Sequence, residues 1–344
     1  RDQPRSRGLG DVYKRQELAD AAQKAFPADT LSPARGESWQ LAAEMGWLMV
    51  RLPEADGGLG LTREASTALH LEMGRILSAM PLIPAQLGLQ AMAASHDFAE
   101  RAEWLERLAA GEYAPLPMLE AALTPRPDGT VSGTISGVFE ADMAAAIIAE
   151  LPNGYALVPL DAPGVSIVER AIWDPSRRLF DVILDGYTPG HMLTDPAGTK
   201  ALHDQLSGEA QLALAADCIG AASAALDMTI EYMKVRRQFD RPIALFQALK
   251  HRAADMKTKI TVAEALLWKR VRDESAGVTD LAAAKVLAAE AFRFVTEEMV
   301  QLHGGIGLTD EHPCHLFLKR ALLNLQLCGN ADLWNERVGR EALS

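Results

Sequence analysis

Apolar residues of this chain recur with a helical period towards both ends and with a strand-like period in the middle. Between residues 17 and 111 they return every three or four positions, as they do from Ser38 to Val50. This spacing places them on one face of a helix. The segment from Pro53 to Gly60 interrupts the pattern with the proline and glycines of a loop. We therefore predict a helical N-terminal domain over residues 17–111.

The segment 112–203 has the period of β-strands. Residues 180–184 alternate between apolar and polar side chains, as a half-buried strand does. The Asn-Gly pair at 153–154 lies between two apolar runs and is a strong hairpin signal, and the Asp-Gly pair at 128–129 marks another turn. A small β-domain is expected here.

The helical period returns over residues 204–344. A helix over residues 208–234 is rich in alanine and glycine, which lets neighbouring helices approach closely. Further helices are expected to start at Pro242, at Thr279 as an N-cap, and at Pro313. Four long helices with short connections predict a C-terminal bundle. The predicted fold class is mainly α with a small β-domain.

Composition narrows the class of protein. A chain of 344 residues can hold two or three domains. Its net charge of −12 argues against nucleic acid and against an anionic membrane surface. The three cysteines lie far apart and form no CxxC pair, which indicates a reduced, cytoplasmic protein. No long apolar run predicts a membrane span.

Residues 1–16 differ from the rest of the chain. They carry five arginines or lysines and show no apolar period. We interpret them as a non-native leader, with a native disordered arm as the alternative, and we exclude them from the fold prediction.

Two short motifs suggest a nucleotide site. Arg236-Arg237-Gln238-Phe239 comes first, and Gln301-Leu302-His303-Gly304-Gly305 follows about sixty residues later. Arginine is the preferred partner of a pyrophosphate, and an aromatic ring can flank a planar base. A diglycine lets backbone N–H groups approach a ligand closely, because no Cβ stands in the way. Either motif alone would also suit an ordinary helix end.

The two motifs in this order resemble the acyl-CoA dehydrogenase family, in which they hold the ADP half of FAD across a subunit interface. The loop from Pro53 to Gly60, the later Glu72–Arg75 and the segment Thr309–Pro313 also match, so the resemblance covers almost the whole chain after Gln16. It implies a barrel-like β middle domain, FAD as cofactor and an acyl-CoA thioester as substrate. It also implies a homo- or hetero-oligomer, and an electron-transfer flavoprotein or similar acceptor as redox partner.

Carried over residue by residue, the resemblance assigns the FAD contacts. Arg236 would bind the pyrophosphate, and Gln238 and Phe239 would line the adenosine side. Gln247 would add a hydrogen bond, and Gln301, Leu302, His303, Gly304 and Gly305 would close over the ADP part. Asp240 stands where the family usually has glycine, and its carboxylate is expected to repel a phosphate.

A metal site is not expected from the sequence. His312, Cys314 and His315 are metal-ligand types, but Pro313 lies among them, and adjacent residues at a helix start do not converge on one tetrahedral ion. His303 is a loop position and is not a proposed base.

The catalytic base that the resemblance implies is missing. The family's glutamate position near the chain end falls on Cys328, whose thiol is a poor base in an apolar site. Some members place the base on the first bundle helix, and that position falls on Ala210, one residue after Glu209. A shift of one residue turns a helical side chain by about 100°, so Glu209 is a candidate base only if a small gap restores the register. Otherwise it is a carboxylate placed by the helix dipole.

The middle domain also departs from the family. The glycine-serine-aspartate run that contacts the flavin ring is absent near the Asp-Gly turn at 128–129, and Val138-Phe139-Glu140 replaces a tryptophan-threonine segment. Three readings stay open: a working acyl-CoA dehydrogenase with a shifted base, a degenerate subunit that completes the FAD site of a catalytic partner, or a flavin monooxygenase component. The combined losses favour the partner subunit, as in heteromeric bacterial enzymes that act on steroid side chains.

Overall fold

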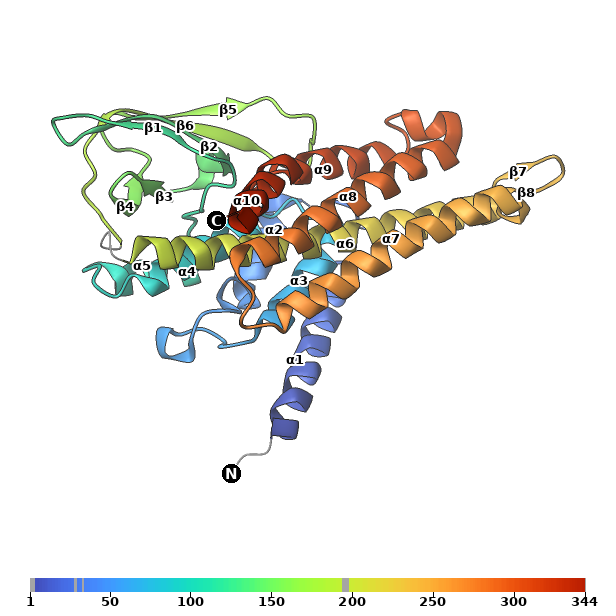
Figure 1. The fold of residues 1–344 in the computed structure, drawn as a ribbon, viewed down its shortest axis with the longest axis horizontal. Coiled ribbons are helices and arrows are strands. Elements are labelled where there is room, and N and C mark those ends of the chain that lie inside the picture. The colour runs from blue at the N-terminus through green and yellow to red at the C-terminus, as the bar shows by residue number, and fades with distance from the viewer. Residues whose placement is uncertain (1–3, 28–29, 33, 194–197, 344) are drawn as a thin grey trace.

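The computed structural model describes residues 4–27, 30–32, 34–193 and 198–343 (Figure 1). A β-domain lies over one end of a set of long helices, and the helical N-terminal part packs against the same set. This arrangement confirms the predicted fold class, mainly α with a small β-domain.

The N-terminal part is helical. Its elements are α1 (Pro4–Ala25), α2 (Arg35–Glu44), the 3₁₀ turns Trp47–Met49 and Glu54–Asp56, α3 (Arg63–Arg75), α4 (Leu82–Ala94) and α5 (Arg101–Ala109). Helix α1 corrects the expectation that residues 1–16 lack structure, since helix begins at Pro4. Apolar side chains near its C-terminal end, Ala22 and Phe26, lie in the core. Extending a helix from such an anchor needs no new nucleation, so residues without an apolar period can be helical.

The middle domain contains two antiparallel sheets around one apolar core. Their strands are β1 (Ala122–Pro125), β2 (Val131–Phe139), β3 (Ala146–Leu151), β4 (Gly154–Pro159), β5 (Val165–Arg170) and β6 (Leu179–Tyr187), with a 3₁₀ turn at Ala141–Met143. The larger sheet has the order β1-β2-β6-β5, and β3 pairs with β4. Both predicted turns join hairpins, and the apolar positions of residues 180–184 are buried in the core, as predicted.

The C-terminal part is an extended helical bundle. It contains α6 (Thr199–Val235), β7 (Arg237–Gln238), β8 (Arg241–Pro242), a 3₁₀ turn at Ile243–Leu245, α7 (Gln247–Val271), α8 (Val278–His303), a 3₁₀ turn at Gly304–Leu308, α9 (Cys314–Gln326) and α10 (Ala331–Leu343). Three predicted helix starts shift. Helix α6 begins before residue 204, α7 begins five residues after Pro242, and the N-cap of α8 is Gly277 rather than Thr279.

Helix α6 is the central element of the fold. Between Ala210 and Leu226 its only charged residue is Asp217. By length and hydropathy α6 could cross a membrane, contrary to the sequence expectation, but 67% of its most apolar window is buried inside the molecule. It therefore serves as the core helix against which α3, α7 and α8 pack.

Helix α3 approaches α6 at backbone distance. A Cβ added at Gly220 would lie 1.9 Å from the Leu71 carbonyl oxygen, and one at Gly74 would lie 2.2 Å from the Asp217 oxygen. Only glycine fits such a contact, which confirms the prediction that the small residues of α6 allow close approach.

A buried ion-pair network joins the three parts of the chain. Arg320 on α9 is fully buried, and its Nε lies 2.7 Å from a carboxylate oxygen of Asp174, which precedes β6. The same guanidinium donates to the Leu77 carbonyl after α3 at 3.3 Å. Arg177 donates to Asp217 of α6 at 3.3 Å. Buried charges of this kind persist only when paired.

Candidate functional site

The first motif forms a hairpin at the C-terminal end of α6. Arg236 is the C-cap residue of α6, and β7 pairs with β8 across the two-residue turn Phe239-Asp240. Both turn residues have positive φ, +52° and +57°, which is the backbone of a type I′ turn. A glycine at Asp240 would relieve that strain. Phe239 is 85% exposed at the hairpin tip.

The second motif spans the end of α8 and the following 3₁₀ turn. Gln301, Gly304 and Gly305 are exposed, and a Cβ on either glycine would meet no heavy atom within 4 Å. Leu302 and His303 are buried, with 6% and 3% exposure. Their side chains therefore face the interior, and a contact of these two residues with a cofactor would come from their backbones.

The structure brings the two motifs together. Tyr232, one helical turn before Arg236, stacks on the His303 ring with centroids 4.3 Å apart. Its hydroxyl donates to the His303 carbonyl oxygen at 3.2 Å. Gln247 begins α7 beside the hairpin and is exposed, with its side-chain nitrogen 2.9 Å from His251. The residues that the resemblance assigns to the ADP part of FAD therefore share one end of the bundle.

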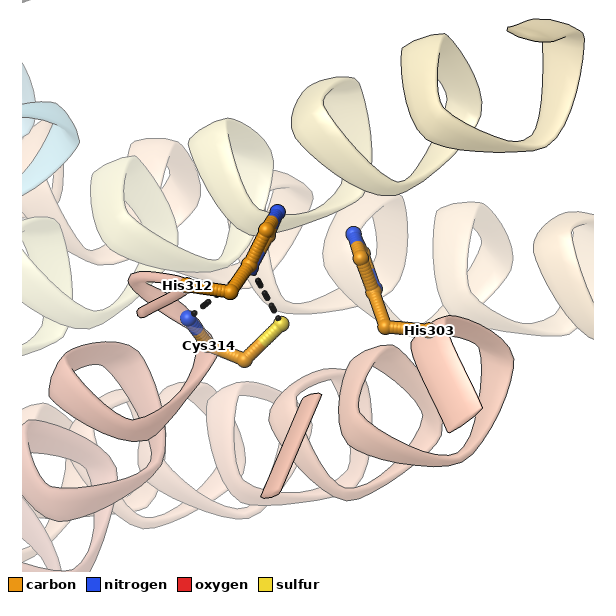
Figure 2. Close-up of side chains that lie close together, drawn as sticks. All are labelled: His303, His312 and Cys314. Carbon is orange, nitrogen blue, oxygen red and sulfur yellow. Dashed lines mark hydrogen bonds between the residues drawn. The ribbon is translucent and has the colours of Figure 1, made fainter. Parts of the chain in front are cut away.

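His312 and Cys314 pack next to this end in a way the sequence did not indicate. They lie against His303, and Figure 2 shows the three side chains together. His315 faces Asp310 and Lys319 instead. The spacing of His312, Cys314 and His315 did not predict this cluster, because its third member, His303, lies nine positions before His312. Burial lowers the pKa of His303 and of His312, so both rings are neutral at neutral pH.

A cavity of about 440 Å³ lies at the other end of α6. It is an open cavity lined by the start of the β-domain, the first turns of α6 and the α9–α10 connection. Cys328 and Ala210 both line it. These are the two positions on which the family's base would fall, so both register counts lead to the same cavity. Neither residue is a carboxylate.

The Cys328 loop is held firmly. The backbone N of Cys328 donates to the Met118 oxygen at 2.8 Å, and its own carbonyl oxygen accepts from Gln211 and Trp334 at 2.8 Å and 3.0 Å. The buried ammonium of Lys285 donates to the Gly329 oxygen at 2.7 Å. Burial raises the pKa of the Cys328 thiol to about 12, so it stays protonated and does not act as a base at neutral pH.

Glu209 points elsewhere. Its carboxylate accepts from Arg63 at 2.8 Å and from Arg51 at 3.4 Å. It lines a small pocket between α3, α4 and α6, beside His70, and it is not among the residues of the large cavity. The structure therefore does not bring Glu209 together with Cys328, and the geometry argues against Glu209 as the base.

Two other carboxylates line the large cavity. Glu150 lies 2.8 Å from His203 Nδ1, and the hydrogen bond that His203 donates to this carboxylate raises the pKa of His203. Glu120 pairs with Arg337 at 3.5 Å. The sequence did not identify either residue as a candidate. Glu150 has the pattern of an ordinary outward-facing position in a strand.

The large cavity and the β7–β8 hairpin lie far apart in one chain. Ala210 and Arg236 are 26 residues apart on α6. At about 1.5 Å of rise per residue they are separated by about 39 Å along the axis. Figure 1 shows the β7–β8 hairpin and the β-domain at opposite ends of the molecule. This span exceeds an extended FAD molecule.

Comparison with known proteins identifies the family. The model of the acyl-CoA dehydrogenase N-terminal domain matches residues 12–112, and that of the C-terminal domain matches residues 197–343. The first match includes residues 12–16, inside the segment that was read as a leader. Acyl-CoA dehydrogenase IpdE2 of Mycolicibacterium smegmatis is 35% identical over 294 residues, 85% of this chain and 83% of that protein.

Solved structures agree. A variant of the Tcur3481–Tcur3483 steroid ACAD has a TM-score of 0.83 and 28% identity, over 98% of this chain and 99% of that chain. The ChsE4–ChsE5 complex of Mycobacterium tuberculosis has a TM-score of 0.81 and 25% identity, over 96% and 97%. The chain belongs to the acyl-CoA dehydrogenase family of FAD-dependent flavoproteins.

Proposed function

We propose that this chain is a subunit of a hetero-oligomeric acyl-CoA dehydrogenase, that it completes the FAD site of a partner chain, and that it supplies no base in its own cavity. The observation that carries the proposal is the cavity itself. Cys328 and Ala210 converge on it from two separate elements, and neither can accept a proton.

The reaction explains why this matters. Bound FAD would supply the acceptor for a hydride from the carbon β to the thioester. A protein carboxylate must take the proton from the α carbon in the same reaction. Here the thiol of Cys328 is neutral, and Glu209 is bound to arginines outside the cavity. Glu150 and Glu120, which do line it, are engaged by His203 and Arg337.

The ADP-side residues fit the other half of the task. Arg236 is exposed at the end of α6, and Gly304 and Gly305 have no Cβ to keep a phosphate away from the exposed loop backbone. Phe239 is an exposed aromatic side chain at the hairpin tip, and such a ring can flank a planar base. These residues lie about 39 Å along α6 from the cavity. An FAD that contacts them therefore has its flavin ring in another chain.

The relatives support a mixed complex. The two similar structures are a Tcur3481–Tcur3483 steroid ACAD and a ChsE4–ChsE5 complex, each named for two chains. We infer that the substrate of the assembled enzyme is an acyl-CoA thioester of steroid origin, and that the partner is a second acyl-CoA dehydrogenase chain.

The test compares the chain alone with the chain mixed with a second acyl-CoA dehydrogenase chain encoded in the same genome. Alone, it is expected to purify nearly colourless and to reduce no electron acceptor when given acyl-CoA. In the mixture, FAD absorbance and turnover are expected to appear together, with one chain of each kind in the unit that binds FAD. An isolated chain that binds stoichiometric FAD and turns over acyl-CoA would overturn the proposal.

A further inference from the structure

Three potential metal ligands meet where the end of α8 faces the start of α9. Donor atoms of His303, His312 and Cys314 all lie within 4.8 Å of one another (Figure 2). His303 is 3% exposed, Cys314 is fully buried, and His312 is half-buried. His303 and His312 lie on either side of the 3₁₀ turn Gly304–Leu308, which begins with the two exposed glycines of the second motif.

His303 is oriented as a metal-binding histidine is. Its Nδ1 lies 2.7 Å from the Met299 carbonyl oxygen. A carbonyl only accepts, so Nδ1 carries the hydrogen and Nε2 keeps a free lone pair. Within the described residues Nε2 is buried and has no hydrogen-bond partner. A backbone carbonyl that fixes the tautomer of a ligating ring is the usual outer-shell arrangement, and an unpaired buried nitrogen otherwise needs an explanation.

The other two side chains lie next to His303. His312 Nδ1 lies 3.0 Å from Cys314 Sγ, and the His303 and His312 ring centroids are 4.4 Å apart. The Tyr232 ring stacks on His303 and packs edge-on against His312 at 6.3 Å, so an aromatic wall shields the group. Two imidazoles and a thiol, with no carboxylate among them, suit a borderline or soft transition metal and not Mg²⁺ or Ca²⁺.

We propose that His303 Nε2, His312 and Cys314 bind one transition-metal ion of the Zn²⁺ class. Zinc bonds of about 2.0–2.3 Å in a tetrahedral site place donor atoms about 3.5 Å apart. The widest separation in the cluster must therefore close by about 1 Å and the 3.0 Å separation of His312 Nδ1 and Cys314 Sγ must open slightly, which side-chain rotation supplies. Cys314 binds as a thiolate, and its proton passes to solvent. The half-buried His312 marks the side from which the ion enters. Three protein ligands leave the fourth position to water.

The bound ion fixes the shape of the turn that follows α8. Two of its ligands, His303 and His312, bracket the 3₁₀ turn Gly304–Leu308, so a bound ion ties the two ends of this loop together. The site belongs to this chain alone and does not depend on the proposed FAD sharing.

The test uses full-length protein without a polyhistidine tag, freed of metal by a chelator. Co²⁺ is titrated spectroscopically, because a cobalt–thiolate bond gives a charge-transfer absorption, and Zn²⁺ is then measured by competition. One ion per chain is expected. Cys314→Ser and His312→Gln should each weaken binding by at least about tenfold, and Cys314→Ser should also abolish the charge-transfer band. The matched control is His315→Gln, one residue from Cys314, which should bind as the unaltered chain does.

Folding is separated from binding by the choice of His312. This residue is half-buried, so glutamine there removes a ligand without opening the core, and circular dichroism confirms the helix content. The proposal is overturned if the unaltered chain shows no saturable binding, or if His312→Gln binds Co²⁺ as tightly as the His315→Gln control.

Discussion

Replacing Arg320 by methionine removes the charge at the centre of the buried network while keeping an unbranched apolar side chain of similar length. Arg320 and its partner Asp174 both have fully buried side chains. The variant therefore leaves the Asp174 carboxylate in the interior without its main partner.

The expected loss is large. Removing one partner of a buried pair costs about 3–5 kcal/mol, because the remaining charge is uncompensated. A domain is stable by only about 5–15 kcal/mol, so the variant loses a substantial fraction of the total. Changing both partners, Arg320→Met with Asp174→Asn, leaves no buried charge at this pair and should recover part of the loss.

The assay is urea unfolding followed by circular dichroism at neutral pH. The matched control is Arg170→Ala, which removes a surface arginine whose side chain is 41% exposed and which pairs with Asp181. That pair should contribute about 0–1 kcal/mol. A loss for Arg320→Met no greater than that of the control would refute the reasoning.

The pH dependence gives a second check. Burial raises the pKa of Asp174, but Arg320 and the Ser176 hydroxyl together offset this, so its pKa lies below the usual range. Its contribution to stability is therefore present above the unfolded pKa of about 3.9 and is lost as the pH falls through the folded value. The stability gap between the unaltered chain and Arg320→Met should narrow in that acidic window. A gap that widens there would contradict the assignment.

Three further predictions concern the FAD site and the candidate positions of the base. In the assembled complex, Arg236→Ala should weaken FAD binding by about 1.5–3 kcal/mol, roughly tenfold to a hundredfold. The measurement is flavin occupancy after gel filtration, and the control is Lys234→Ala at a neighbouring exposed residue. Unchanged occupancy would remove Arg236 from the site. Glu209→Gln should leave turnover of the complex unchanged in steady-state assays, because its carboxylate is held by Arg63 and Arg51 away from the cavity. Abolished turnover with intact substrate binding would restore Glu209 as the base. In the same assay, Cys328→Glu should create no activity in the isolated chain.

Short-range patterns could be predicted from the sequence because their physics is local. The Asn-Gly hairpin at 153–154 and the alternation at residues 180–184 depend on turn geometry and on a period of two, and both are present. The register counts to Cys328 and Ala210 also led to one cavity, because a shared fold preserves spacing along its helices.

The remaining features depend on contacts between distant segments. Arg320 and Asp174 are 146 positions apart, and no local pattern relates them. His303 completes a cluster with His312 and Cys314 only because a 3₁₀ turn folds the chain back on itself. The direction in which the Glu209 side chain points could not be predicted for a similar reason. Its partners, Arg63 at the start of α3 and Arg51 before it, belong to the N-terminal part.

The length of α6 gives the two ends of this chain different freedom to change. In a complex where each chain lends its hairpin end to the neighbouring chain, a substitution near Cys328 affects only the cavity of its own chain, whereas one near Arg236 affects a reaction centre in another protein. Substitutions around the cavity can therefore accumulate, whereas substitutions in the hairpin are restricted by the reaction of the partner chain. One rigid helix therefore lets a chain give up its own chemistry and still be required for its partner's.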